Sequence, residues 1–162
     1  MRIAVLGLGE AGGEIARDLV AAGADVRGFD PSVRPPPGVQ LRTGDADAVR
    51  DADLVLSVNS SHDAVPALES SLPALAPGTI WADLNTASPA VKQALVERLA
   101  GRDVAVADVA LMAPVPGRGL RTPMVVSGPG AARYADILAG FGADITVQPG
   151  PVGDRAPPAR GP

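Results

Sequence analysis

The chain has 162 residues, of which 46% are hydrophobic and only 2% aromatic, and its formal net charge is −4. This length and composition allow one core of aliphatic side chains, and the negative charge excludes the electrostatic footprint of a nucleic-acid-binding protein. Because the chain has no cysteine and one histidine, His62, disulfides, thiolate chemistry and a multi-histidine metal site are excluded. The apolar runs are too short for a secretory signal or a membrane span, so we expect no membrane partner and a cytoplasmic protein.

Short apolar runs alternate along the chain with segments of helical or loop character, which is the pattern of βαβ units. The runs expected to form strands are 3–6, 26–29, 54–58, 79–82, 104–107 and 124–126. A helix is expected after the first run, because apolar residues recur there with helical spacing until Gly23. Its apolar residues are Ile15, Ala16, Leu19 and Val20. A core of Val, Leu, Ile and Ala favours parallel strands covered by helices on both faces.

A second helix is expected between Pro89 and Gly101. Ser88 supplies the N-cap hydroxyl, and Pro89 takes the first helical position, where its missing N–H needs no partner. The apolar face of this helix is expected to contain Val91, Leu95, Val96 and Leu99. The single lysine of the chain, Lys92, is expected on its exposed side.

Two proline-rich segments are expected to lie outside the regular elements. Residues 31–38, PSVRPPPG, favour an extended and mobile surface loop. Residues 149–162 contain one sizeable apolar side chain, Val152, so we expect a disordered tail that follows a single domain at 1–148.

A glycine-rich motif of the form G-x-G-x-x-G lies between the first strand and the first helix, at Gly7, Gly9 and Gly12. The three glycines allow a tight turn, close approach of the backbone to a pyrophosphate and close packing of helix on strand. Backbone N–H groups and the helix N-terminus bind the phosphate, so an acidic protein needs no lysine there. In this context the motif predicts a Rossmann-type, doubly wound α/β fold. Its cofactor-binding residues are Gly7, Leu8, Gly9, Glu10, Ala11 and Gly12.

Asp30 ends the second strand, 18 positions after Gly12. An acid at that distance accepts hydrogen bonds from a ribose hydroxyl of NAD. Its charge repels a 2′-phosphate, so we predict NAD as the preferred cofactor over NADP, although Arg34 in the following loop could contact such a phosphate. Alternatively, the Asp30 side chain could serve only the turn at Pro31, by hydrogen-bonding to the backbone there.

Polar or small residues end the predicted strands, and in an open parallel sheet these carboxyl ends form the ligand crevice. The residues are Gly7, Asp30, Asn59, Asp83, Asp108 and Gly128. Asn59, Ser60 and Ser61 could reach the nicotinamide ribose, or they could simply cap the next helix. His62 in the same turn is expected to be solvated rather than catalytic.

Two further segments could orient a substrate. Residues 81–89, WADLNTASP, place Asn85 and Thr86 at the crevice, where they could hydrogen-bond a hydroxy acid. Residues 108–123 carry Arg118 and Arg121 on a Gly/Pro-rich loop. These guanidinium groups could pair with a substrate carboxylate, or they could be solvated surface arginines.

Three segments together resemble the β-hydroxyacid dehydrogenase family, which includes 3-hydroxyisobutyrate and 6-phosphogluconate dehydrogenases. They are GLGEAG at 7–12, DLNTASP at 83–89 and APVPGRG at 113–119, and the similarity covers about residues 1–150. The variants GEAG and MAPVPGRGLRTP look closest to the phosphogluconate-dehydrogenase-like oxidoreductases. The resemblance implies an NAD(P)-binding domain for hydride transfer between a small hydroxy acid and nicotinamide.

The resemblance also assigns roles to single residues. Gly7, Gly9, Gly12 and Asp30 would hold the dinucleotide, Asn59 and Thr86 would lie near its nicotinamide end, and Gly117 would shape the substrate pocket. With these, the substrate-binding candidates are Asn85, Thr86, Gly117 and Arg118. Pro116 stands where the family's loop has serine, so the resemblance does not identify the substrate.

Family members continue into a helical domain that supplies a catalytic lysine, and Lys92 does not match its position. We therefore expect no catalytic residue in this chain and little or no turnover from it alone, with the helical domain lost, frameshifted or supplied by a separate chain. The alternative is a non-enzymatic dinucleotide-sensing or interaction module. A flavin or methyl-donor protein would share only the glycine turn.

Overall fold

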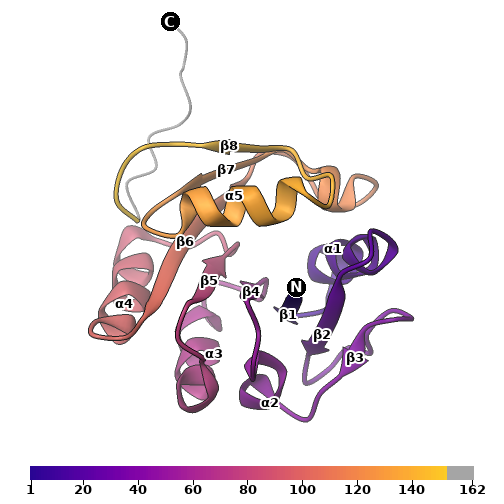
Figure 1. The fold of residues 1–162 in the computed structure, drawn as a ribbon, viewed down its shortest axis with the longest axis horizontal. Coiled ribbons are helices and arrows are strands. Elements are labelled where there is room, and N and C mark those ends of the chain that lie inside the picture. Colours follow the sequence, from indigo (N-terminus) through magenta and orange to yellow (C-terminus); the bar gives the residue numbers. More distant parts are fainter. Residues whose placement is uncertain (153–162) are drawn as a thin grey trace, which may run out of the picture.

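One sheet runs through the computed structural model, which describes residues 1–152 (Figure 1). Its strands are β1 (Arg2–Leu6), β2 (Asp25–Phe29), β3 (Gln40–Leu41), β4 (Leu54–Ser57), β5 (Thr79–Asp83), β6 (Val104–Leu111), β7 (Met124–Ser127) and β8 (Ile145–Val147). The strand order is β3-β2-β1-β4-β5-β6-β7-β8, and every neighbouring pair is parallel except β6 and β7. The predicted mostly parallel sheet is confirmed.

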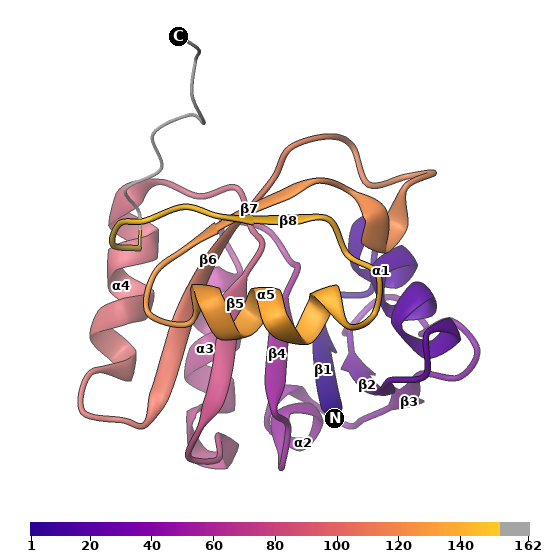
Figure 2. The same cartoon turned by 45° about the horizontal axis from the view of Figure 1, so that its top comes forward.

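Helices cover both faces of this sheet (Figure 2). They are α1 (Glu10–Ala21), α2 (Asp45–Val49), α3 (Ala64–Ser71), α4 (Pro89–Leu99) and α5 (Ala131–Ala139), with 3₁₀ turns η1 (Leu72–Ala74) and η2 (Gly119–Arg121). The first face is covered by α1, η2 and α5, and the second by α2, α3 and α4. The fold is therefore a doubly wound, Rossmann-type α/β domain, as predicted.

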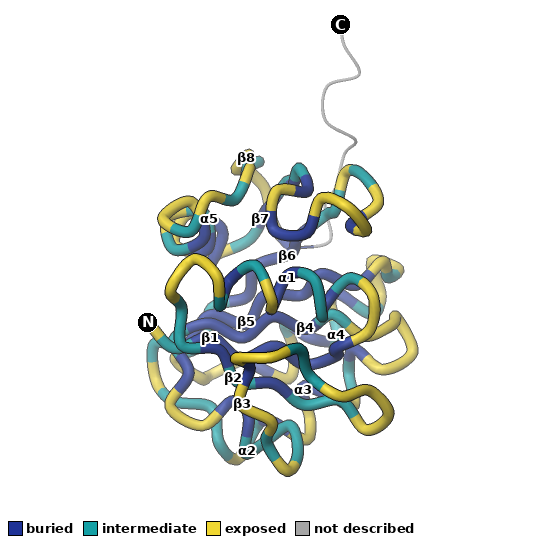
Figure 3. The backbone as a smooth tube through the Cα atoms, turned by 90° about the vertical axis from the view of Figure 1, so that its right-hand side faces the viewer, coloured by how far each residue is buried: buried dark blue, intermediate teal, exposed yellow. Residues whose placement is uncertain are grey.

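The apolar runs form strands because both of their faces are buried, so no polar alternation is needed. In β1, Ile3 and Val5 point into the first core cluster, while Ala4 and Leu6 point into the second. The central strands are accordingly buried, and exposure is concentrated in the loops (Figure 3).

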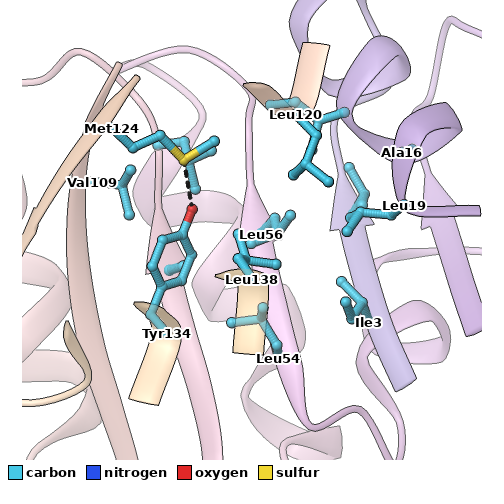
Figure 4. Packing of buried hydrophobic residues seen from close by; sticks show 14 of the residues in the cluster. Ile3, Ala16, Leu19, Leu54, Leu56, Val109, Leu120, Met124, Tyr134 and Leu138 are labelled. Carbon is cyan, nitrogen blue, oxygen red and sulfur yellow. Dashed lines mark hydrogen bonds between the residues drawn. The ribbon is translucent and has the colours of Figure 1, made fainter. Parts of the chain in front are cut away.

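The first cluster joins α5, η2 and α1 over the sheet (Figure 4). Tyr134 is its largest side chain, and the Tyr134 hydroxyl donates to the Met124 sulfur at 3.2 Å. Leu120 of η2 and Leu19 of α1 belong to the same cluster, so the loop before β7 packs on the first helix.

Two strands, β3 and β8, were not predicted from the sequence. They lie at opposite edges of the sheet. With two and three residues, they are too short to show a hydrophobic period in the sequence. The segment 31–38 contains no helix or strand, as expected. No helix within residues 1–152 is long and apolar enough to cross a bilayer.

The tail expected from residue 149 begins with residues that pack on the domain. Val152 is 8% exposed and belongs to the second core cluster, and the Gly128 N–H donates to the Gly150 carbonyl at 3.2 Å. The packed chain therefore extends past residue 148 to Val152. The rest of the expected tail lies outside the described residues.

Candidate functional site

A cleft of about 420 Å³ opens at the carboxyl ends of β1, β2 and β4. This is the point where the strand order reverses, because β1 lies between β2 and β4, and open α/β sheets bind ligands there. Five of the predicted cofactor residues line it: Gly7, Gly9, Asp30, Asn59 and Ser60.

The three motif glycines have three different environments. Gly7 has φ +97°, and a Cβ there would overlap the Val58 carbonyl of the neighbouring strand end. A Cβ at Gly12 would overlap the Gly7 carbonyl oxygen, so α1 can pack on the turn only if residue 12 is glycine. Above Gly9 nothing lies within 4 Å of the position of a Cβ, which leaves open space over the turn.

The N-terminus of α1 faces this open space without a side-chain cap. Gly9 is the N-cap residue and makes no side-chain hydrogen bond, so the first N–H groups of the helix are left for a ligand or for water. Bare backbone N–H groups with room above them suit a pyrophosphate. The residues present therefore fit a dinucleotide.

Asp30 forms the turn that the sequence offered as one of its two roles. One carboxylate oxygen accepts from the N–H groups of Ser32 at 2.8 Å and Val33 at 3.0 Å, as a turn residue does. The other accepts from the Leu8 N–H at 2.8 Å, which ties the glycine turn to the end of β2. The same residue lines the cleft.

A second carboxylate, Asp45, stands on the same wall of the cleft. Burial raises the pKa of Asp45, and the negative charge of Asp30 raises it further. Two carboxyl groups, Asp30 and Asp45, thus stand close to each other in this part of the cleft. Asp45 was not predicted from the sequence, because it belongs to a short helix without a clear hydrophobic period.

Asn59 and Ser60 line the other wall, and both also hold local structure. The Asn59 N–H donates to Asn85 Oδ1 at 2.6 Å, although Asn59 itself is exposed. The Ser60 hydroxyl accepts from the Asp63 N–H at 3.2 Å. The N-cap residue of α3 is Asp63, and no side chain caps this helix, so the prediction that Asn59 or Ser60 caps it is wrong. His62 is exposed, as expected.

Asn85 faces inward. It is 4% exposed, and its amide nitrogen donates to Asp83 Oδ1 at 2.7 Å and to Ser57 Oγ at 3.2 Å. With both amide protons bonded inside the protein, Asn85 is better suited to position the loop than to contact a substrate. Thr86 follows it and is exposed.

The expectation that Lys92 is exposed is wrong. Lys92 is 1% exposed, and its ammonium contacts the carboxylates of Asp83 and Asp108, with 2.7 Å to Asp108 Oδ1. The buried face of α4 consists of Lys92, Leu95 and Leu99, whereas Val91 is only half-buried. The spacing i, i+3, i+7 of these three residues is the signal that could have placed the lysine inside.

The loop resembling the family's substrate segment is docked on α1. The Gly117 N–H donates to Glu14 Oε1 at 3.2 Å, and the Leu120 N–H donates to Asp18 Oδ2 at 2.9 Å. Arg118 is exposed, and its guanidinium donates to the Pro114 carbonyl at 3.2 Å. The carboxylates of Glu14 and Asp18 thus hold this loop on α1, at Gly117 and at Leu120.

Gly119→Ala is expected to lower the free energy of unfolding by about 2 kcal/mol, measured by urea denaturation. Gly119 has φ +54°, and a Cβ would overlap the Asp18 carboxylate, which must then release Leu120. Gly117→Ala is the matched control: φ is +86° but the Cβ meets nothing within 4 Å, so its cost should be smaller by about 1 kcal/mol. Equal costs for both variants would show that the contact with Asp18 is unimportant.

The fold and the cleft together define a dinucleotide-binding domain of the Rossmann class. The chain belongs to the family of the NAD binding domain of 6-phosphogluconate dehydrogenase, whose sequence profile matches residues 2–147. The resemblance to β-hydroxyacid dehydrogenases is thereby confirmed. The family binds a nicotinamide dinucleotide.

Several solved structures share this fold. A conserved hypothetical protein from Sinorhizobium meliloti 1021 has 25% identity and a TM-score of 0.86, with 94% of this chain matching 55% of that chain. Mycobacterium tuberculosis 3-hydroxyisobutyrate dehydrogenase with L-serine has 24% identity and a TM-score of 0.79, again with 94% and 55% covered. An imine reductase from Myxococcus stipitatus in complex with NADP+ has 18% identity and a TM-score of 0.81, with 94% and 56% covered.

The chain thus spans about half the length of the solved structures that it matches. A comparison with curated protein sequences found no match.

Proposed function

We propose that this chain binds NAD(H) in the cleft, as the coenzyme domain of an oxidoreductase acting on a small hydroxy acid. The bound coenzyme would supply the hydride acceptor or donor. The observation that carries the proposal is the open backbone cradle over Gly9 at the sheet's switch point, together with family membership. The L-serine bound to the 3-hydroxyisobutyrate dehydrogenase supports a small hydroxy acid as the substrate class.

The proposed contacts follow the cleft from one end to the other. The turn at 7–12 would bind the pyrophosphate, and Asp30 would accept from the adenosine ribose. Asn59, Ser60 and Thr86 would face the nicotinamide half. Gly117 and Arg118 would contact the substrate, whereas Asn85 would act through the loop that it holds.

We further propose that the chain alone has little or no turnover, and that the acid–base group comes from a helical domain or a separate chain. The only lysine of the sequence, Lys92, is paired with two buried carboxylates, so it is not available to a substrate. This same observation supports the second candidate, a non-enzymatic dinucleotide-sensing module. NAD-dependent oxidation of any β-hydroxy acid by the purified chain would reject the sensing module.

NADH is expected to bind at least about tenfold more tightly than NADPH, as measured by calorimetric titration of the purified chain. The reason is the negative wall formed by Asp30 and Asp45. Asp30→Asn should shrink this preference by about tenfold, because it removes one charge from the wall. Asp136→Asn, an exposed position on α5, is the control and should leave the preference unchanged.

Two results would contradict these proposals in different ways. Equal or tighter binding of NADPH would overturn the preference for NAD. Failure of both nucleotides to bind would overturn the coenzyme role of the cleft.

A further inference from the structure

A row of buried polar side chains crosses the carboxyl edge of the sheet beside the cleft. Each residue of this row is the register partner of the next, and none is more than 1% exposed. The row consists of Ser57 of β4, Asp83 of β5, Asp108 of β6 and Ser127 of β7. Lys92 reaches the two carboxylates of this row from α4, which lies beside β6 (Figure 2).

A chain of hydrogen bonds leads from this cluster to the cleft. Asp83, held by Lys92, accepts from the Asn85 amide at 2.7 Å. The other end of the same amide, Asn85 Oδ1, accepts from the Asn59 N–H at 2.6 Å. Asn59 lines the cleft, so the ammonium of a buried lysine is connected to the cleft wall through two intervening side chains.

Stability alone does not account for this cluster. Removing an ammonium and two carboxylates from water is costly, and well-packed apolar residues of similar volume often serve a core equally well or better. Burial raises the pKa of Asp83, and the ammonium of Lys92 opposes that shift. What the ionic cluster provides beyond packing is directional bonding, which sets the position of the Asn85 amide.

We propose that Lys92 is a positioning residue for the coenzyme, which acts through Asp83 and Asn85 to hold the Asn59 peptide against the nicotinamide half of the dinucleotide. This inference rests on the proposed function of the cleft. It gives a role to the chain's only lysine that differs from acid–base catalysis.

The test compares two nucleotides on one variant. Lys92→Met should weaken NADH binding by about tenfold in calorimetric titrations, whereas the affinity for ADP should change by less than about twofold. ADP contains only the adenosine and diphosphate groups, which the turn at 7–12 and Asp30 would bind. A general structural loss would weaken both nucleotides equally, and that result, or unchanged NADH binding, would overturn the proposal. Gln93→Met, on the exposed side of the same helix, is the control and should bind both nucleotides normally.

A second variant and a measurement on the unaltered chain cover the case in which Lys92→Met fails to fold. The pair Lys92→Met with Asp108→Asn leaves one buried carboxyl, which can be neutralised by a proton, and should show the same selective loss of NADH affinity. In the unaltered chain, the Asn59 amide should exchange with deuterium slowly although the residue is exposed. Rapid exchange would break the proposed connection whatever the variants do.

These measurements separate this inference from the proposed function. If the unaltered chain binds neither NADH nor ADP, the coenzyme role fails, and the positioning role fails with it even if the Asn59 amide is protected. If NADH binds but Lys92→Met and its paired variant leave the ratio of the two affinities unchanged, only the positioning role fails.

Discussion

Replacing Gly12 with alanine is expected to lower the free energy of unfolding by about 3 kcal/mol and to weaken NADH binding by more than about tenfold. The added Cβ would overlap the Gly7 carbonyl oxygen, which is backbone and cannot rotate away. Either α1 moves off β1 or the turn opens, and both movements displace the N–H groups that would bind the pyrophosphate. Urea denaturation and calorimetric titration measure the two effects separately.

Gly9→Ala is the matched variant for Gly12→Ala, because it adds the same methyl group where nothing lies within 4 Å. Its effect on stability should be about 1 kcal/mol or less, the difference between glycine and alanine at an N-cap. NADH affinity should nevertheless fall by at least about tenfold, because the methyl group occupies the space assigned to the pyrophosphate. Normal NADH binding by Gly9→Ala would contradict that assignment.

Lys92→Met is expected to lower the free energy of unfolding by about 3–5 kcal/mol at neutral pH. The variant leaves the carboxylates of Asp83 and Asp108 buried beside each other without the ammonium that now contacts both. Urea denaturation measures the loss. Gln93→Met should stay within about 0.5 kcal/mol of the unaltered chain, because its side chain is exposed.

The loss caused by Lys92→Met should depend on pH. Burial raises the pKa of Asp83 above its ordinary value, so the folded chain binds this proton more tightly than the unfolded chain. The stability that comes from this proton is fully present below the ordinary pKa of about 3.9, and it is lost as the pH rises through the raised pKa. Without the ammonium of Lys92, the pKa of Asp83 should rise further. The loss in free energy of unfolding caused by Lys92→Met should therefore grow from about pH 4 to pH 7. A deficit that is constant over this range would contradict the buried-charge explanation.

Most of the fold could be predicted from the sequence because its elements are locally encoded. Both faces of β1, β4 and β5 are buried, and their apolar runs are visible without any knowledge of their neighbours. The glycine spacing at 7–12 identified the turn, and Ser88 identified the start of α4, where its hydroxyl accepts from the Val91 N–H at 3.3 Å. The edge strands β3 and β8 were missed because two or three residues form a strand only when a neighbouring strand offers hydrogen bonds.

The cleft residues were predicted only in part. Gly7, Gly9 and Asp30 follow from a spacing rule, and they line the cleft. Asp45 belongs to the same wall, but it lies on a short helix whose docking beside Asp30 depends on the path of the loop between them. The inward direction of Asn85 could not be predicted either, because its partners Ser57 and Asn59 come from a different strand end.

By itself, the sequence determined that the chain is a doubly wound α/β domain with a glycine turn suited to a dinucleotide. These features depend on side chains that lie close together along the chain. Only the tertiary structure decided that Lys92 is buried, because its partners lie 9 and 16 positions away on strands whose register brings Asp83 and Asp108 side by side. A charge is stable inside a protein only if opposite charges meet it there, and that depends on the lateral packing of α4, β5 and β6.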